Sequence, residues 1–278
     1  MQKLIKREQI AGMNIHYLFY SLEYFLDAQA NAGIKTIELW PGTPHFFLSY
    51  LEYSDCRRVK KLLDERGLTV KIITPENCTY QYQFAAQERE QWEKSLGYFK
   101  KALDAGEELG VEIMAINSGW GYWNEEREEA WKRSREMLSA LAEYAKTKNI
   151  RLAMESLRPQ ESNLATTVQD VKRMLDEVNH PNLKAMIDTT AMGVAGETID
   201  QWFSVLGEDI IHMHFIDGNP YGHLIWGDGN HNLEEFLEAV NRHGYTGYFG
   251  QEITEFDYFQ NPEKADKRNM QAYAPFIR

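Results

Sequence analysis

The segments Arg151-Leu-Ala-Met-Glu155 and Leu183-Lys-Ala-Met-Ile-Asp188 decide the fold class of this chain. Each is a short apolar run that ends on a carboxylate, and a helical pattern over Thr167–Glu177 separates the two runs. Two parallel strands need a crossover connection, which is usually a helix, so this order is typical of a βαβ unit. The segments therefore predict neighbouring parallel strands whose acidic ends lie at the same edge of a sheet.

The same alternation of strand and helix runs along the chain. The predicted strands are Ile10–Ile15, Thr36–Trp40, Thr69–Thr74, Ile113–Asn117, Arg151–Glu155, Leu183–Asp188, Ile210–Asp217 and Gly247–Glu252. The predicted helices are Leu22–Ala32, Asp55–Arg66, Gln87–Leu109, Glu125–Lys148, Thr167–Glu177, Thr198–Leu206 and Leu233–Arg242, and a last helix follows Pro262. The residues expected to end helices are Gly33, Gly67, Gly110 and Gly244.

The number and spacing of these units decide the architecture. Eight strand–helix units without a linker or a break in composition favour a closed barrel over a doubly wound sheet. A barrel of this kind takes about 250 residues, which is close to the 278 residues of the chain. We therefore predict an α/β fold with a single (β/α)8 TIM-barrel domain over residues 1–278.

Charge and composition exclude several classes of protein. The net charge is −12 and the pI is about 5.2, which disfavours nucleic acid as a partner. Residues 1–8 are polar, and no apolar run reaches the roughly 18 residues of a membrane span. Cys56 and Cys78 lack the spacing of a metal site and are predicted to be reduced thiols. We therefore predict a cytoplasmic protein that binds neither nucleic acid nor membranes.

Four consecutive predicted strands carry, at or near their ends, groups that can bind a metal: Glu155, Asp188, His214 and Glu252. Barrel enzymes build their active sites at the C-terminal ends of the strands, so these side chains should meet. Three carboxylates at one barrel mouth would repel one another, and a divalent cation is the simplest compensation. Oxygen and nitrogen ligands suit manganese, with magnesium, cobalt or zinc as alternatives. A competing explanation is that the carboxylates cap helices or pair with Arg158.

Five segments carry a resemblance to a known family. They are residues 37–45 (Ile-Glu-Leu-Trp-Pro-Gly-Thr-Pro-His), 74–77 (Thr-Pro-Glu-Asn), 154–163 (Met-Glu-Ser-Leu-Arg-Pro-Gln-Glu-Ser-Asn), 186–188 (Met-Ile-Asp) and 212–217 (His-Met-His-Phe-Ile-Asp). They resemble the xylose isomerase-like family of TIM-barrel sugar phosphate isomerases and epimerases, which includes ketose 3-epimerases, hydroxypyruvate isomerase and endonuclease IV. Within this family the chain is most similar to the fructoselysine 3-epimerase and ketose 3-epimerase group. The resemblance covers nearly the whole chain.

The resemblance implies an activity and a mechanism. It implies epimerisation at C3 of a ketose or ketosamine of the fructoselysine, tagatose or psicose type. Glu155 and Glu252 would bind the metal and also act as acid and base on opposite faces of the sugar, through an enediolate. The resemblance also implies a homodimer or homotetramer. The alternatives are an aldose–ketose isomerase of the same family, an endonuclease IV-like nuclease and a non-catalytic sugar-binding module.

Residues in the loops after the strands are candidates for contact with a sugar substrate: His45, Glu76, Trp120, Arg158 and His223. Each has a structural alternative, such as an ion pair between Arg158 and Glu161 or the packing of an aromatic ring. Glu38 lies two residues before the end of its predicted strand, where pairing inside the barrel is favoured over catalysis. Many ketose 3-epimerases have a histidine three residues after the aspartate that corresponds to Asp188, whereas this chain has Ala191 at that position. The sugar substrate is therefore left open.

Overall fold

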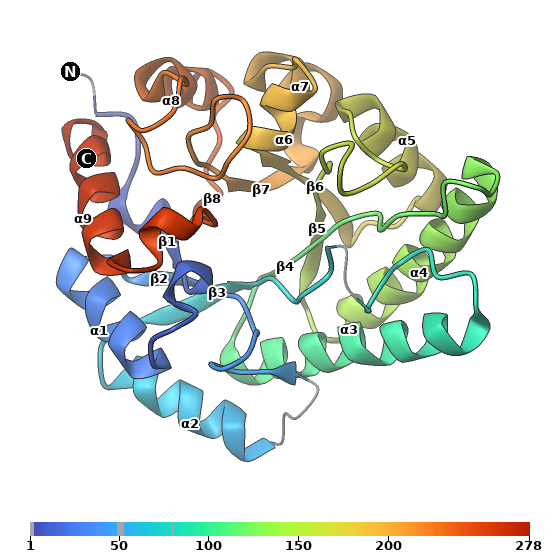
Figure 1. Cartoon of the computed structure of the whole chain (residues 1–278), viewed down its shortest axis with the longest axis horizontal. Coiled ribbons are helices and arrows are strands. Elements are labelled where there is room, and N and C mark those ends of the chain that lie inside the picture. Colours follow the sequence, from blue (N-terminus) through green and yellow to red (C-terminus); the bar gives the residue numbers. More distant parts are fainter. Residues whose placement is uncertain (1–2, 49–52, 79–80) are drawn as a thin grey trace.

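The strands form the closed barrel that the sequence predicts. The computed structural model describes residues 3–48, 53–78 and 81–278. Within these ranges, eight parallel strands follow one another around the barrel, and β1 pairs with β8 to close it (Figure 1). The strands are β1 (Ile10–Met13), β2 (Thr36–Leu39), β3 (Thr69–Ile73), β4 (Ile113–Ile116), β5 (Arg151–Met154), β6 (Leu183–Asp188), β7 (Ile210–His214) and β8 (Tyr248–Gln251). The predicted TIM-barrel fold is confirmed, although most strands end one to three residues earlier than predicted.

A ring of helices surrounds the barrel (Figure 1). The α-helices are α1 (Leu22–Ala32), α2 (Tyr53–Asp64), α3 (Arg89–Leu109), α4 (Arg127–Thr147), α5 (Val168–Val178), α6 (Thr189–Val194), α7 (Ile199–Leu206), α8 (Leu233–Arg242) and α9 (Pro262–Tyr273). Short 3-10 helices are η1 (Arg7–Gln9), η2 (Ile15–Tyr17), η4 (Gly207–Asp209), η5 (Phe256–Tyr258) and η6 (Ala274–Phe276). Each predicted helix is present to within two residues at either end. In the described part of the chain, no helix is both long and apolar enough to cross a bilayer.

The sequence pattern does not predict α6, which follows β6 directly. Its sequence, Thr-Thr-Ala-Met-Gly-Val, contains two threonines, a valine and a glycine, which are weak helix formers. The helix begins because the Asp188 side chain accepts a hydrogen bond of 2.7 Å from the backbone N–H of Ala191. A strand-end carboxylate thus acts as a helix cap, which is one of the alternatives that the sequence leaves open.

Glycine ends the helices where the sequence predicts it. Gly33 after α1 and Gly110 after α3 have φ angles of 74° and 77°, in the left-handed region that favours glycine. At each position the glycine N–H bonds back to carbonyl groups of the last helical turn. The chain can therefore leave each helix and enter the next strand within a few residues.

The apolar core has two layers, and β4 shows how one strand supplies both. Met114 and Ile116 belong to the cluster between strands and helices, whereas Ile113 and Ala115 belong to a separate cluster. Because successive side chains of a strand point to opposite faces, the second cluster fills the inside of the barrel. Its members are Ala11, Ile72, Ile113, Ala115, Ala153, Met186 and Ile211.

Two register shifts interrupt the regular pairing of the strands. One lies between Ile37 and Glu38 where β2 pairs with β3, and the other between Ala185 and Met186 where β6 pairs with β7. A bulge re-aims the side chains that follow it and is common beside active sites. The first shift comes directly before Glu38 on β2, and the second comes directly before Met186, which pairs with His212 on β7. Both shifts therefore lie beside polar groups of the barrel interior.

A buried carboxylate ties the last helix to the start of the chain. Asp266 of α9 accepts hydrogen bonds from His16 Nε2 at 2.9 Å, from the Tyr17 hydroxyl at 2.6 Å and from Gln29 Nε2 at 2.5 Å. His16 and Asp266 are almost fully buried. Burial of a charge is tolerated here because three donors compensate the lost hydration.

We predict that Asp266→Asn destabilises the fold. The amide keeps the shape but loses the charge and turns an NH2 group toward the donors, so we expect the free energy of unfolding to fall by about 1.5–3 kcal/mol. Urea unfolding followed by circular dichroism measures the change. Asp27→Asn is the control, since Asp27 makes an exposed ion pair with Arg66, and it should cost less than about 1 kcal/mol. Equal loss in both variants would contradict the prediction.

Candidate metal centre and active site

The four predicted metal ligands lie together at the C-terminal opening of the barrel. His214 is the last residue of β7, and its Nδ1 lies 3.4 Å from Glu155 Oε2, 3.6 Å from Asp188 Oδ2 and 3.1 Å from Glu252 Oε2. Asp188 ends β6, while Glu155 and Glu252 directly follow β5 and β8. Four neighbouring strands thus each contribute one group to a single point.

The chemistry of His214 tests whether these groups fit a metal. Its Nε2 lies 2.9 Å from Glu38 Oε1, so in the neutral ring this nitrogen carries the hydrogen. Nδ1 is buried and has no hydrogen-bond partner among the described residues. In the neutral ring its lone pair would face three carboxylates, an arrangement that is repulsive unless a proton or a metal cation lies between them. One nitrogen with carboxylate oxygens is a ligand set for a divalent metal, and the residues fit one.

The ionisation of the cluster also points to an excess of negative charge. Burial alone would lower the pKa of His214, but the charges of Glu252 and Glu38 outweigh it and hold this pKa well above its ordinary value. Burial raises the pKa of Glu155 to about 7, and the charges of Glu252 and Asp188 add to the rise while His214 opposes it. Without a metal the cluster therefore takes up protons, and a cation would supply the same compensation.

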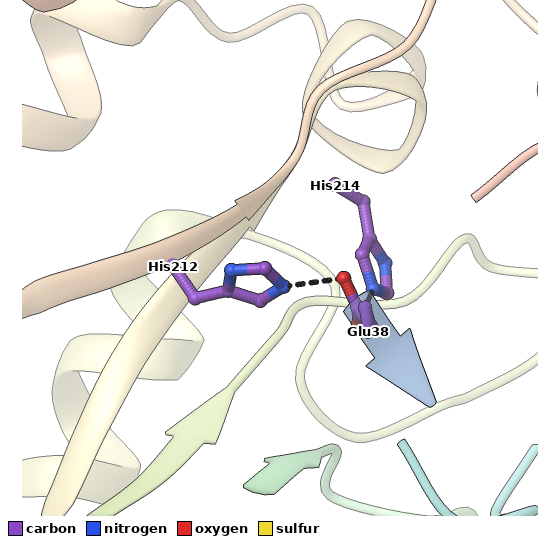
Figure 2. A group of neighbouring side chains, drawn as sticks. All are labelled: Glu38, His212 and His214. Atoms are coloured by element: carbon purple, nitrogen blue, oxygen red, sulfur yellow. Dashed lines mark hydrogen bonds and ion pairs between the residues drawn. The ribbon is translucent and has the colours of Figure 1, made fainter. Parts of the chain in front are cut away.

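Glu38 lies between two histidines of β7, His212 and His214, which Figure 2 draws together. Its Oε2 accepts a hydrogen bond of 3.0 Å from His212 Nε2, and its Oε1 accepts hydrogen bonds from His214 Nε2 at 2.9 Å and from the Thr74 hydroxyl at 2.6 Å. Burial would raise the pKa of Glu38, but the two imidazoles outweigh it and hold the pKa well below the usual range. Glu38 thus pairs inside the barrel, as its place in the strand predicts.

Gly250 on β8 makes room for Glu38. A Cβ atom at this position would lie 2.0 Å from Glu38 Oε2 and 3.2 Å from His212 Cε1. The contacts of His212 and Thr74 with Glu38 were not predicted. Two features of the sequence could have indicated these contacts. The His-x-His spacing places both rings on one face of a strand, and a carboxylate within an apolar strand needs hydrogen-bond partners.

His223 lies closer to the proposed metal ligands than the sequence indicates. It comes from the loop after β7, and its Nε2 lies 3.4 Å from Asp188 Oδ2 while its Nδ1 lies 3.5 Å from Glu252 Oε2. Burial lowers its pKa, but the charges of Asp188 and Glu252 outweigh it and raise the pKa to about 9. A hydrogen bond of 3.1 Å to Thr254 Oγ1 joins its loop to the one after β8. His223 is therefore either a substrate contact, as predicted, or a further ligand.

Two other predicted substrate residues, Glu76 and Trp120, lie in the loops after β3 and β4, at the C-terminal end of the barrel. Glu76 accepts a hydrogen bond of 3.2 Å from Trp40 Nε1, and burial raises its pKa to about 7, with the charge of Glu252 adding to the rise. Trp120 Nε1 is buried and has no partner within the described residues. Trp120 and Glu161 line a cavity of about 200 Å3. Both predicted residues therefore offer polar groups to a ligand.

The remaining two predicted substrate residues already have protein partners. Arg158 forms the ion pair with Glu161 that the sequence offers as the alternative, with Nε 2.9 Å from Oε2. His45 is buried, and its Nε2 lies 2.8 Å from the Tyr20 carbonyl oxygen while its Nδ1 lies 2.8 Å from Asn14 Nδ2. Contact of either residue with a substrate stays a prediction.

A wider depression lies at the other end of the barrel. It measures about 690 Å3 and is lined by Lys6, Arg151 and Tyr248 among others. Arg151 and Tyr248 begin β5 and β8, so this depression is at the N-terminal opening. Enzymes with this barrel have their active sites at the C-terminal opening, and the carboxylate cluster lies there. We therefore assign the candidate active site to the C-terminal end.

Comparison with known proteins identifies a family. The family model described as xylose isomerase-like TIM barrel matches residues 26–275. Fructoselysine 3-epimerase of Escherichia coli is 29% identical over 255 residues, which cover 91% of this chain and 92% of that protein. D-psicose 3-epimerase of Ruminiclostridium cellulolyticum is 21% identical over 245 residues, which cover 84% of this chain and 80% of that protein.

Solved structures share the fold. A D-psicose 3-epimerase from Clostridium cellulolyticum, crystallised with D-tagatose, superposes with a TM-score of 0.79 at 19% identity, covering 96% of this chain and 97% of that one. An L-ribulose 3-epimerase superposes with a TM-score of 0.78 at 20% identity, covering 96% of this chain and 93% of that one. At these identities the superpositions support the barrel and its chain order.

We predict that a divalent cation stabilises the metal-free protein. Manganese would relieve the repulsion among Glu155, Asp188 and Glu252, and at about 100 times Kd the expected rise in Tm is roughly 5–10 °C. Differential scanning calorimetry with and without MnCl2 measures it. In the control Asp188→Asn, the amide oxygen can still accept from Ala191 but a ligand charge is lost, so the rise should shrink. The same Tm with and without manganese would count against a metal centre.

Proposed function

Because this chain belongs to the xylose isomerase-like TIM barrel family, we propose that it is a divalent-metal-dependent epimerase acting at C3 of a ketose or ketosamine. The observation that carries the proposal is the buried Nδ1 of His214, which faces three carboxylates at the C-terminal opening of the barrel. The similarity to fructoselysine and D-psicose 3-epimerases supports the reaction class. Manganese is the metal that we propose, with magnesium, cobalt or zinc as alternatives.

The proposed mechanism uses the two glutamates as proton carriers. One carboxylate of the pair Glu155 and Glu252 removes the proton from C3, and the other returns a proton to the opposite face of the sugar. The two residues follow β5 and β8, which are three strands apart in the barrel, so they reach the centre from different directions. A divalent cation held by Glu155, Asp188, His214 and Glu252 would supply Lewis-acid stabilisation of the negative charge that develops on the substrate oxygens.

The surrounding residues are proposed to bind the sugar. His223 lies against Asp188, and Glu76 and Trp120 carry polar groups in the loops after β3 and β4 at the same end of the barrel. We propose that all three contact hydroxyl groups of the substrate. Arg158 and His45 are fixed by protein partners and are proposed to shape the loops of the substrate site. The proposed partner is thus a small sugar, and assembly into a homodimer or homotetramer stays a prediction.

We predict that the protein exchanges the C3 hydrogen of its substrate with solvent. Ketoses and fructosamines incubated with the protein and manganese in deuterium oxide should gain deuterium at C3 and form the C3 epimer, as followed by NMR. A sample freed of metal by EDTA dialysis is the control and should be inactive. Deuterium at C1 or C2 together with aldose formation would instead indicate an aldose–ketose isomerase, and full activity without metal would contradict the metal requirement.

We also predict that Glu155→Gln and Glu252→Gln each abolish epimerisation. The amide keeps the size of the side chain but cannot carry the proton, so the rate should fall by about 10²–10⁴-fold or more. The measurement is the rate of epimer formation on the ketose or fructosamine that shows exchange at C3 with the wild-type protein. Circular dichroism should show that both variants remain folded. Deuterium incorporation at C3 that persists in both variants would disprove the acid–base assignment.

A further inference from the structure

Glu38 contacts His214, one of the four proposed metal ligands, at Nε2 (Figure 2), whereas the other ring nitrogen, Nδ1, lies near the three carboxylates. We propose that Glu38 is a positioning residue, which accepts a hydrogen bond from His214 Nε2 and thereby fixes Nδ1 as the nitrogen offered to the metal. This inference rests on the proposed metal centre. It assigns a role to a buried carboxylate that the acid–base mechanism does not use.

The identity of the donors and acceptors carries the argument. An ionised carboxylate only accepts hydrogen bonds, so His214 Nε2, at 2.9 Å from Glu38 Oε1, must be the nitrogen with the hydrogen. A neutral imidazole has one such hydrogen, and Nδ1 is then left with a lone pair. This nitrogen is the one that lies 3.1–3.6 Å from the oxygens of Glu252, Glu155 and Asp188. Histidines that bind metals usually donate their other N–H to a partner of this kind.

The surroundings hold the Glu38 carboxylate in one orientation. Oε1 also accepts from the Thr74 hydroxyl at 2.6 Å, and Oε2 accepts from His212 Nε2 at 3.0 Å. Gly250 leaves the space that Oε2 occupies, since a Cβ atom there would lie 2.0 Å away. Glu38, His212 and His214 are fully buried, so no water competes at the surface of the group. The carboxylate is therefore a fixed acceptor for His214.

A cation bound directly by Glu38, His212 and His214 is the competing explanation, because these residue types can hold one. The hydrogen bonds favour the positioning role, since both carboxylate oxygens already have donors and one has two. The two explanations predict different numbers of metal ions per chain. Metal stoichiometry therefore distinguishes them.

The variant Glu38→Gln removes the charge but preserves the shape. The amide oxygen can still accept from His214 and Thr74, while the NH2 group faces His212 Nε2. His212 Nδ1 has no hydrogen-bond partner among the described residues, so that ring can move its hydrogen to Nδ1 and accept from the amide. We therefore expect the variant to fold. His214 loses its charged acceptor, which is the change that the proposal concerns.

Asp266→Asn is the matched control. Asp266 is also a buried carboxylate 2.9 Å from a histidine Nε2, that of His16, but His16 is not among the proposed ligands. Both variants lose a buried charged acceptor of a histidine, and both should lower the stability of the fold. A purely structural role for Glu38 predicts the same metal affinity in the two variants.

Titration of metal-free protein with MnCl2, followed by electron paramagnetic resonance of the unbound ion, measures affinity and stoichiometry. We expect one Mn²⁺ per wild-type chain, with Kd raised about 10–100-fold in Glu38→Gln and unchanged within about twofold in Asp266→Asn. Nitrogen-15 NMR of the zinc-loaded wild type should show His214 bound through Nδ1 and protonated at Nε2. The NMR measurement needs no variant, so it tests the proposal even if Glu38→Gln does not fold.

The outcomes that differ from these expectations overturn either the positioning role of Glu38 or the metal centre itself. Wild-type affinity in Glu38→Gln, or metal bound through His214 Nε2, overturns the positioning role but leaves the metal centre in place. Two Mn²⁺ per wild-type chain and one in Glu38→Gln would make Glu38 itself a ligand and also overturn the proposal. No manganese binding by the wild type would overturn the proposed metal-dependent function together with this inference.

Discussion

The repulsion among three carboxylates at the mouth of the barrel is the constraint on which the functional part of this structure depends. Glu155, Asp188 and Glu252 are turned toward one imidazole nitrogen, where burial limits the hydration of their charge. The protein partly offsets this charge with neighbours, since a backbone N–H bonds to Asp188 and His223 lies against two of the carboxylates. The divalent cation that we propose would complete the compensation, and it would use the buried nitrogen that has no hydrogen-bond partner among the described residues.

The barrel holds these groups in fixed positions relative to one another. Parallel strands bring their carboxyl ends to one edge, so each group needs only to stand at the end of its own strand. Two register shifts, beside Glu38 and just before His212, accompany the polar groups inside the barrel. Below the mouth, the small and branched residues of the inner cluster fill the barrel.

The loops that follow the strands supply the residues that surround Asp188 in this chain. The position after β6 where many ketose 3-epimerases have a histidine is occupied by Ala191, whose N–H bonds to Asp188. The imidazole beside that carboxylate is instead His223, held by Thr254 of the next loop. The similarity to fructoselysine and D-psicose 3-epimerases supports the proposed reaction class, whereas a shared barrel does not identify a substrate, which must be found by experiment.

The sequence by itself determined the barrel, its strands and the four groups at consecutive strand ends, because periodicity and alternation are local properties of the chain. Helix α6 was missed because its weak helix formers depend on the Asp188 cap. Only the tertiary structure decided that His214 turns Nδ1 to the carboxylates and Nε2 to Glu38, and that Arg158 and His45 are already bonded. The contacts of His214 and His45 join residues far apart in sequence, so their geometry exists only once the barrel has closed, whereas the Arg158–Glu161 pair is local and is anticipated from the sequence.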